Sequence, residues 1–498
     1  MAAVTIAEML AIESAAVASG WSEEQLLTHA GERLGLSVSR YFPVPGTAVA
    51  YLGKGHNAGD TLVALRILRD RFGWKIAARC AWPIDQCAPL TRQKWKEIAI
   101  GPPLDGPPAW RDLDRPLVLL DGLLGTGACG PLRSPLADLA REMASLREQA
   151  GARIAAVDLP SGIDADRGEI SRDTVTADVT FMIGSAKRGL LQGHAAAATG
   201  ALALVPVGPL GSETPGDLEL ISPQTLACGK APRPFDFHKG MAGRVAILAG
   251  SECYSGAAVL APTRALRGGG GLITLFLPRQ AKSLIAAKCP PEIIVRDIGN
   301  PLELLECRFD SLVLGCGLGE MGTAAAEGLL ELISRSPAPV VIDADALNLI
   351  ASMGEVGILT QNHVVTPHPG EFARLAPDLA EQPREQAARR FCDRSAATLL
   401  LKGSRTIVTR RGEPLWINST GTPAMASGGQ GDLLAGVIGA RLAIGDPPLQ
   451  ATALAAWVCG RAAEIALGER NVSEESLAAS TVSACLGAAF GDWKTCCR

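Results

Sequence analysis

Short apolar runs recur along the whole chain, and each ends in a loop that carries glycine or aspartate. The runs are rich in β-branched residues, and a helical pattern follows each of them. Runs of this kind are typical of strands that are buried on both faces and separated by helices, so they predict parallel α/β sheets. They cover residues 47–53, 75–80, 116–122, 153–162, 179–184 and 201–208 in the first half, and residues 244–251, 271–278, 311–317, 339–345, 363–370 and 397–403 in the second.

A stretch rich in proline, glycine and polar residues separates the two series of runs. We therefore predict a first domain over residues 1–210, a linker over 211–235 and a second domain over 236–498. Residues 405–421 contain two strand-like segments around a glycine-bearing turn, which predicts a hairpin that adds an antiparallel edge to the second sheet. Open parallel sheets bind ligands beyond the carboxyl ends of their strands, so we expect a site in each domain.

The composition is that of a globular protein and points to small-molecule partners. Of 498 residues, 47% are hydrophobic and 20% are charged, and the net charge of −4 comes from dispersed charges of both signs. This balance gives no basic surface for nucleic acid. No apolar run reaches the ~20 residues that span a bilayer, and the N-terminus lacks a basic segment, so we expect no membrane partner and a cytoplasmic location. A homo-oligomer is also expected.

The cysteines and histidines form no recognisable metal pattern. Thirteen cysteines occur with no CxxC pair, and most are predicted to be small buried hydrophobes in a reducing compartment. Six histidines occur without an HExxH pattern, which gives no support to a metalloprotease.

The second half contains a stretch that can hold an anion beside a carboxylate, MASGGQGDLLAG (425–436). Gly428, Gly429 and Gly431 leave backbone N–H groups accessible, and the helix that follows directs its positive end toward the same point. Asp432, in the first turn of that helix, is suited to accept a proton from an attacking hydroxyl group. A glycine-rich turn with Asp432 as an ordinary helix cap is the alternative interpretation.

Two neighbouring loops add groups that such a site would use. Lys402 lies at a strand end before a glycine, a place suited to a nucleotide phosphate, although a lone lysine there is more often solvated. Two prolines rigidify the loop around His368 and Glu371. A single histidine is usually structural, so its role depends on the residues that surround it.

Six ordered motifs of the second half together resemble a known family. They are GSECYSGAAVLAPTRALRGGGGLIT, VLGCGLG, VIDADALN, TPHPGEFARL, LKGSRTIV and GTPAMASGGQGDLLAG, within residues 238–498. In this order they resemble the ADP- or ATP-dependent NAD(P)H-hydrate dehydratases, which are relatives of ribokinase. The resemblance implies a ribokinase-like three-layer α/β sandwich.

The resemblance also implies site residues. The substrate would contact Ala257, Gly317, His368 and Asp432, and the nucleotide would contact Lys402, Gly403, Ser404, Arg405, Thr406 and Gly431. Two positions depart from the family pattern, because Cys316 stands where GPGLG has proline and Gln430 stands where serine or threonine is common. Neither change removes an acid or a backbone donor, so we expect them to tune affinity.

The first half repeats the theme of glycine and aspartate at strand ends. Its motifs are GKGHNAGDTLVALRIL, DGLLGTGACGPL, LPSGIDADRG and GSAKRGLLQG. Together they resemble the NAD(P)H-hydrate epimerases over about residues 1–210, which implies a Rossmann-like three-layer sandwich. Fusion of the two halves resembles the bifunctional hydrate repair enzymes.

By this second resemblance Asn57, Asp121 and Ser161 would bind potassium, and all three offer hard oxygen ligands. His56 and Ala58 occupy places where the family has asparagine and glycine, and Ala58 adds a methyl group at its position. Asp158 is our own candidate for the proton-handling group, with ribose binding as its alternative role. The substrate would contact His56, Asn57, Ala58, Gly59, Asp60, Gly125, Thr126, Gly127, Ala128, Cys129, Gly130, Pro131 and Asp158.

The two resemblances imply a repair cycle for damaged nicotinamide cofactors. Phosphoryl transfer from ADP or ATP, with magnesium on the phosphates, would convert the hydroxyl group on carbon 6 of the hydrate into a good leaving group. The dehydratase family accepts the S epimer, and the epimerase half would interconvert R and S.

Two other functions are compatible with parts of the sequence. GTGACG (125–130) fits a dinucleotide fingerprint, but Pro131 and Pro135 interrupt the helix that the fingerprint needs, which disfavours an NAD-dependent oxidoreductase. The closer alternative is a ribokinase-like small-molecule kinase whose N-terminal half is a non-catalytic binding module.

Overall fold

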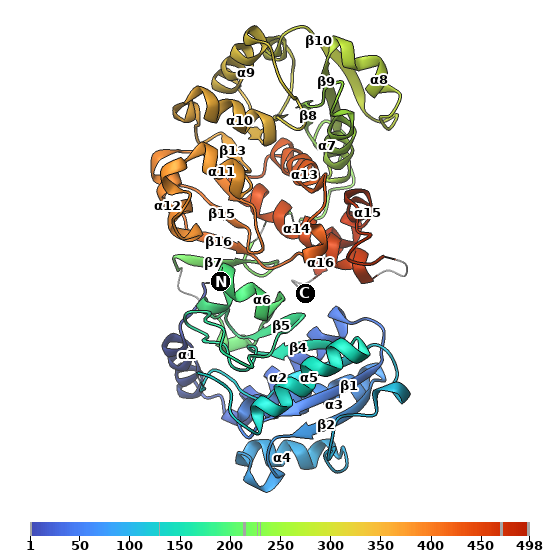
Figure 1. Ribbon diagram of the computed structural model, residues 1–498, viewed down its shortest axis with the longest axis vertical. Coiled ribbons are helices and arrows are strands. Elements are labelled where there is room, and N and C mark those ends of the chain that lie inside the picture. Colours follow the sequence, from blue (N-terminus) through green and yellow to red (C-terminus); the bar gives the residue numbers. More distant parts are fainter. Residues whose placement is uncertain are drawn as a thin grey trace. The chain divides into compact units, whose positions relative to one another are not determined.

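The computed structural model describes residues 2–128, 130–212, 216–226, 228–229, 231–468 and 472–495. The chain forms two compact units, residues 1–220 and 221–498 (Figure 1). The division lies inside the stretch that the sequence predicts as a linker, and part of that stretch is a strand, β7 (Leu218–Ile221).

The first unit is built on a six-stranded sheet in the order β2-β1-β3-β4-β5-β6, in which every neighbouring pair is parallel. Each predicted run of the first half contains one strand, so the predicted parallel sheet is confirmed. The strands are β1 (Thr47–Leu52), β2 (Lys75–Cys80), β3 (Leu117–Gly122), β4 (Arg153–Val157), β5 (Val179–Ile183) and β6 (Ala201–Val205).

Helices cover both faces of this sheet because successive side chains of a strand point to opposite sides. Ala48 and Ala50 of β1 pack in one core with residues of α2 and α3, whereas Val49 and Tyr51 pack in another with residues of α5. The arrangement is a three-layer sandwich. The helices of this unit are α1 (Ile6–Ala18), α2 (Glu23–Tyr41), α3 (His56–Phe72), α4 (Pro89–Ile98), α5 (Leu136–Ala150) and α6 (Ala196–Thr199).

The second unit contains a ten-stranded sheet in the order β10-β9-β8-β11-β12-β13-β14-β15-β16-β7. Its strands from β10 to β14 are parallel, and β14, β15 and β16 pair antiparallel. Besides β7, the strands are β8 (Arg244–Leu248), β9 (Leu272–Pro278), β10 (Ile294–Ile298), β11 (Ser311–Leu314), β12 (Val340–Ile342), β13 (His363–Val365), β14 (Thr398–Leu401), β15 (Ile407–Thr409) and β16 (Leu415–Asn418).

The predicted hairpin is present as β15 and β16, but the prediction that it forms the edge is wrong. β7 follows β16 in the sheet order and takes the outer place. Strand β10 was not predicted, because its alternating burial and charged residues differ from the continuous apolar runs of the other parallel strands.

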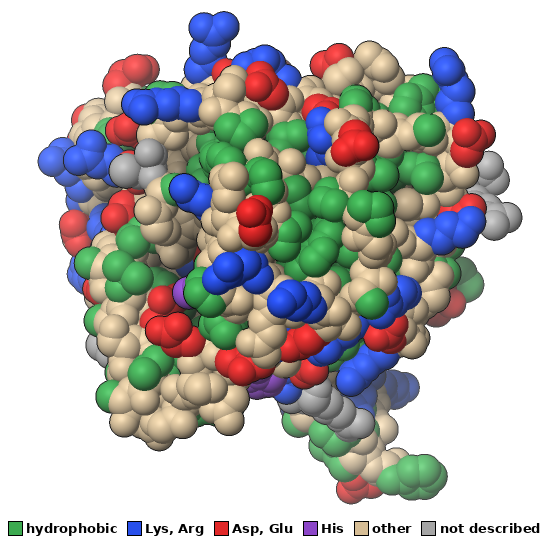
Figure 2. Space-filling view, turned by 90° about the horizontal axis from the view of Figure 1, so that it is seen from below, with side chains coloured by type: hydrophobic (Ala, Val, Ile, Leu, Met, Phe, Trp, Pro, Cys, Tyr) green, Lys and Arg blue, Asp and Glu red, His purple; other side chains and the backbone are tan. Residues whose placement is uncertain are grey.

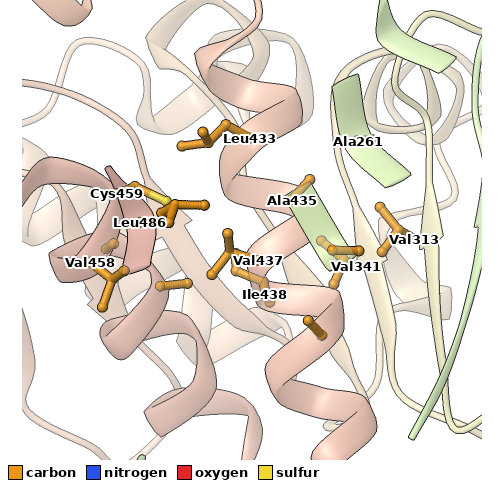
Figure 3. Close-up of a cluster of buried hydrophobic side chains, with 14 of the residues drawn as sticks. Ala261, Val313, Val341, Leu433, Ala435, Val437, Ile438, Val458, Cys459 and Leu486 are labelled. Carbon is orange, nitrogen blue, oxygen red and sulfur yellow. The ribbon is translucent and has the colours of Figure 1, made fainter. Parts of the chain in front are cut away.

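A central helix, α13 (Gln430–Ile444), carries the core of the second unit. In Figure 3, its Val437 and Ile438 lie between Val458 of α14 and Val341 of β12. The helix is buried along most of its length from Leu433 onward, and its first turn is partly exposed. The other helices are α7 (Ser255–Arg267), α8 (Lys282–Ala286), α9 (Thr323–Arg335), α10 (Ala344–Met353), α11 (Pro369–Leu375), α12 (Arg384–Arg394), α14 (Pro448–Gly468), α15 (Ala479–Ala484) and α16 (Leu486–Thr495).

The surface carries charges of both signs. Lysine and arginine side chains lie among aspartate and glutamate side chains over the face shown in Figure 2. None of the described helices combines the length and the apolar composition that a bilayer crossing needs.

Candidate functional site

The glycine-rich turn of the second unit leads directly into α13. Gly429 caps the helix with φ +87°, a left-handed conformation that favours glycine, and Asp432 lies in the first helical turn. A side chain on Gly428 would meet no described atom within 4 Å, so its backbone faces open space. The turn therefore offers an accessible backbone at the positive end of a buried helix.

Asp432 is surrounded by charged groups and one thiol. Burial and the nearby Asp343 raise the pKa of Asp432 to about 6, while a hydrogen bond with Cys316 and the charges of Lys402 and Arg264 oppose that rise. A carboxyl group with this pKa is ionised at neutral pH and remains basic enough to take a proton.

Lys402 is ion-paired with a residue that the sequence analysis did not select. Its Nζ lies 2.6 Å from Oδ1 of Asp343, and the Asp343 side chain is only 3% exposed. Burial opposes the charged form of Lys402, but Asp343, with smaller contributions from Glu371 and Cys316, offsets this effect and raises the pKa of the lysine. A Cβ on Gly431 would lie 3.4 Å from both Lys402 Nζ and Asp343 Oδ2, so the pair stands beside the glycine-rich turn.

The loop predicted to bind the nucleotide, residues 402–406, connects β14 to β15. Arg384 of α12 donates from Nη2 to the carbonyl oxygens of Leu401 and Lys402, at 3.2 and 3.1 Å, and so packs against this loop. The Thr406 hydroxyl donates to the Gly403 carbonyl at 3.0 Å. The Arg405 side chain is 5% exposed, and burial lowers its pKa to about 10. The Arg405 side chain is therefore part of the interior, and beyond Lys402 the loop presents mainly backbone groups to a ligand.

Two of the predicted substrate positions lie together. A Cβ on Gly317 would stand 2.9 Å from Ala257 Cβ and 2.8 Å from Tyr254 Cβ, and Tyr254 is exposed.

His368 is a helix cap, because its Nδ1 accepts from the N–H groups of Gly370 and Glu371 at 3.0 and 3.3 Å. This capping role places the ring proton on Nε2, 3.5 Å from Glu371.

Two of the three predicted potassium ligands of the first unit, Asp121 and Ser161, contact each other, and Asn57 is linked to Ser161 through the backbone of Leu124. The Ser161 hydroxyl donates to Asp121 Oδ1 at 2.7 Å and its N–H donates to Oδ2 at 2.8 Å. The Asn57 amide donates to the carbonyl oxygens of Leu124 and Val157, at 2.7 and 3.0 Å. Burial raises the pKa of Asp121 to about 6, and its hydrogen-bond donors in the described part of the chain are all neutral. A buried carboxylate of this kind fits a monovalent cation.

Asp158 is held in an uncommon conformation. Its φ is +68°, a region that residues other than glycine rarely adopt, and its Oδ1 accepts both an ion-paired hydrogen bond from Lys187 and the N–H of Ile183 at 2.9 Å. Lys187 is 1% exposed and also donates to the Ile183 carbonyl at 2.8 Å.

Asp60 and Glu13 complete an acidic environment around this ion pair. Burial, and then the charges of Asp158 and Glu13, raise the pKa of Asp60 well above its usual range. Burial and the charge of Asp158 also raise the pKa of Glu13. His56 is exposed at the start of α3, whereas the Ala58 methyl group packs into the hydrophobic core.

The loop over residues 125–131 adjoins Asn57, one of the predicted cation ligands. A Cβ on Gly125 would lie 3.2 Å from Asn57 Cβ. Cys129 lies outside the described residues, and the remainder of the loop is not helical before α5 begins at Leu136. The helix that a dinucleotide fingerprint requires is therefore missing from the described part of this loop.

Three charged residues of these sites were not predicted from the sequence: Lys187, Asp343 and Glu13. Lys187 and Asp343 lie in motifs that were recognised, GSAKRG and VIDADALN, and each follows the end of a buried strand. A charged residue at such a place was an available signal. Glu13 lies on α1, far from the motifs, and only the fold relates it to Asp158.

Two family models match the chain. One, described as NAD(P)H-hydrate dehydratase, matches residues 245–484. The other, described as YjeF-related protein N-terminus, matches residues 23–189. The two matches fall within the second and the first unit respectively.

Individual proteins give the same result. A bifunctional NAD(P)H-hydrate repair enzyme from Gloeobacter violaceus is 34% identical over 91% of each chain. A ribokinase-like superfamily protein from Enterococcus faecalis is 24% identical, with a TM-score of 0.50 over 57% of this chain and 98% of that one, which supports the predicted fold. A Bacillus subtilis ADP/ATP-dependent NAD(P)H-hydrate dehydratase, co-crystallised with ATP/Mg²⁺, is 26% identical with a TM-score of 0.47, over 55% of this chain and 98% of that one. This chain therefore belongs to the bifunctional NAD(P)H-hydrate repair enzymes, with the dehydratase in its second unit and the epimerase in its first.

Proposed function

We propose that Asp432 is the general base of the dehydration and that the turn over residues 428–431 holds the migrating phosphoryl group. The observation that carries this proposal is a carboxylate with a pKa of about 6 in the first turn of α13, directly after accessible glycines. Asp432 takes the proton of the hydroxyl group on carbon 6, and that oxygen attacks the terminal phosphorus of ATP or ADP. The nucleotide leaves with the bonding electrons of the broken P–O bond.

The second stage restores the ring. The phosphate departs with the electrons of the C–O bond, pushed by the ring nitrogen, and proton loss from the neighbouring carbon re-forms the double bond. Backbone N–H groups of the turn stabilise the charge on the phosphoryl oxygens during transfer. The positive end of α13 adds to that effect.

The nucleotide is proposed to lie along residues 402–406 and Gly431, with magnesium carried on its phosphates as part of the co-substrate. Lys402 supports this role because it stands beside Gly431 while Asp343 fixes its position. The substrate ring is proposed to lie near Ala257, Gly317 and His368.

In the first unit, Asp158 is proposed to handle the proton during R-to-S exchange. Its pairing with Lys187 and its strained backbone support a functional role rather than a packing role. Potassium would be held by Asn57, Asp121 and Ser161, where its charge would offset that of the buried carboxylate. The homo-oligomer and the cytoplasmic location stay predictions.

The dehydration proposal is tested with Asp432→Asn. We expect nucleotide affinity to stay within about threefold of the wild type while turnover of the S-hydrate falls at least about 100-fold, because a general base contributes ~10²–10⁴ in rate. Recovery of the reduced-nicotinamide absorbance is the measurement. Near-normal turnover would remove Asp432 from the mechanism, and a stable phosphorylated product from the wild type would favour the kinase alternative.

The epimerase is tested by offering pure R- and S-hydrate separately with ATP or ADP. We expect the wild type to restore both, and Asp158→Asn to restore the S-hydrate alone. If the wild type restores only the S-hydrate, the first unit is catalytically silent.

A further inference from the structure

Arg384 is the first residue of α12, and its guanidinium lies directly against the loop proposed to bind the nucleotide. Its Nη2 donates to the carbonyl oxygens of Leu401, the last residue of β14, and of Lys402. A Cβ on Gly403 would stand 2.5 Å from that Nη2 and 2.9 Å from Nη1, so the missing side chain of Gly403 leaves the space that the guanidinium fills. The charge of Arg384 is therefore positioned at the carboxyl end of β14, the edge of the sheet where ligands bind.

The hydrogen bonds to the loop leave part of this guanidinium without an acceptor. Arginine has five N–H donors in a fixed geometry. In the part of the chain that the structure describes, Nε is buried with no acceptor, and none lies within reach of Nη1. Burial also lowers the pKa of Arg384. A partly buried cation with unused donors is stabilised by an anionic ligand.

No protein carboxylate takes that place among the described residues. Glu385 follows Arg384 and its charge acts on the guanidinium, but no described carboxylate oxygen lies within 4 Å of a guanidinium nitrogen. The other two cations of the loop are already used, since Asp343 pairs with Lys402 and the Arg405 side chain lies in the interior. The charge of Arg384 is thus the one that this loop leaves for a ligand, within the described chain.

We propose that Arg384 is a nucleotide-binding residue of the dehydratase: the two carbonyl contacts of Nη2 fix the guanidinium, and Nη1 donates to a phosphate oxygen of ADP or ATP. This inference rests on the nucleotide position proposed above, along residues 402–406. A lysine would supply the charge, but its single nitrogen cannot hold both carbonyls and a phosphate in the same geometry. Arg384 therefore favours phosphorylated nucleotides over the bare nucleoside.

The test measures the dissociation constants of ADP and ATP, each with magnesium, and of adenosine for the full-length wild type, Arg384→Met and Arg384→Lys. Loss of a charge-assisted hydrogen bond should weaken ADP and ATP about 10- to 100-fold in Arg384→Met. Adenosine has no phosphate, so its affinity should change less than about threefold. Arg384→Lys should give an intermediate loss for ADP and ATP.

Arg394→Met is the matched control. Arg394 is the last residue of the same helix, is exposed, and pairs with Asp378 at 2.7 Å. Its replacement should leave all three dissociation constants within about twofold of the wild type, since exposed ion pairs contribute little. If Arg384→Met binds ADP as well as the wild type does, or loses adenosine as much as ADP, Arg384 only shapes the loop and the inference is wrong.

Ser404→Glu separates this inference from the nucleotide position on which it rests. Ser404 is exposed on the loop, so an added negative charge there should weaken ADP if the phosphates lie alongside. Weaker binding in Ser404→Glu but not in Arg384→Met would retain the nucleotide position and reject the role of Arg384. Unchanged ADP binding in both variants would reject the nucleotide position itself.

The salt dependence of binding gives a second measurement. Screening weakens the attraction between a partly exposed cation and a phosphate. The dissociation constant of ADP should therefore rise with salt in the wild type and rise less steeply in Arg384→Met. Equal slopes in the two proteins would contradict a contact between Arg384 and the phosphates.

Discussion

The two units share one feature of strand order but pair their charges differently. In the first sheet β2 and β3 flank β1, and in the second β9 and β11 flank β8, so in both sheets the chain first builds outward on one side of a strand and then returns to its other side. Each unit also opens a helix after a glycine and carries an aspartate near its start, Asp60 on α3 and Asp432 on α13. The architecture alone does not distinguish the two chemistries.

The lysines do distinguish them. In the first unit Lys187 binds the candidate proton-handling residue, Asp158, directly. In the second unit Lys402 binds Asp343 and not the candidate base itself. The pKa of that base, Asp432, is raised to about 6, and burial is the first cause. In the second unit the lysine thus pairs with a neighbour of the candidate base, whereas in the first unit it pairs with the candidate proton-handling residue itself.

The largest expected effect is that of Lys187→Met. Removing this buried cation leaves Asp158 as an unpaired buried charge, which should cost about 3–5 kcal/mol of unfolding free energy. We expect R-to-S exchange to fall at least about 100-fold. Exchange is measured with pure R-hydrate, and stability by denaturant unfolding.

The double variant Lys187→Met with Asp158→Asn is the matched control. It removes both charges, so most of the lost stability should return while exchange stays low. Dehydration of the S-hydrate should persist in both variants, since their substitutions lie in the first unit. Exchange near the wild-type rate in the single variant would contradict the direct role of the pair.

A smaller effect is expected from two matched glycines. A Cβ on Gly53 would lie 1.8 Å from the Leu123 carbonyl oxygen, and one on Gly315 would lie 1.8 Å from that of Asp343. Gly315 also has φ +112°. Gly53→Ala should therefore lower the unfolding free energy by about 1–3 kcal/mol, and Gly315→Ala by about 2–5 kcal/mol, because overpacking is joined by backbone strain.

Denaturant unfolding of the two variants measures the difference. Gly315→Ala should also reduce dehydration, because the clash displaces the backbone that carries Asp343. Equal losses of stability, with dehydration intact, would show that the conformation of Gly315 contributes nothing.

The sequence was sufficient for the parts of the fold that repeat. Continuous apolar strands, such as those around β1 and β11, have a simple pattern, and glycines before Asp432 and Asn57 mark helix starts beyond strand ends. β10 was missed because its residues alternate in burial, and β7 because it lies among prolines and glycines that indicate a linker. Strand order also escaped prediction, since it depends on packing between distant segments.

The candidate sites show the same limit at the level of single residues. Motifs identified Asp432 and Asp158, but not which cation stands beside each of them. Lys402 was predicted to meet phosphate, and its pairing with Asp343 becomes visible only when β12 and β14 are placed in one sheet. Pairings of this kind join residues far apart in sequence, and no local pattern encodes them.

The smallest expected effect is that of Asp343→Asn, which would make the second unit resemble the first. Without Asp343, its own charge no longer raises the pKa of Asp432 and the charge of Lys402 is no longer offset, so the pKa of Asp432 should fall from about 6. Because Asp432 works when ionised, the acid limb of kcat/KM for the S-hydrate should move down by about half a unit to one pH unit. Asp343→Glu retains the charge and should leave the limb near its original position. A limb that stays in place or rises in Asp343→Asn would mean that the pairing of Lys402 does not set the basicity of Asp432, and the contrast between the two units would then have to come from burial alone.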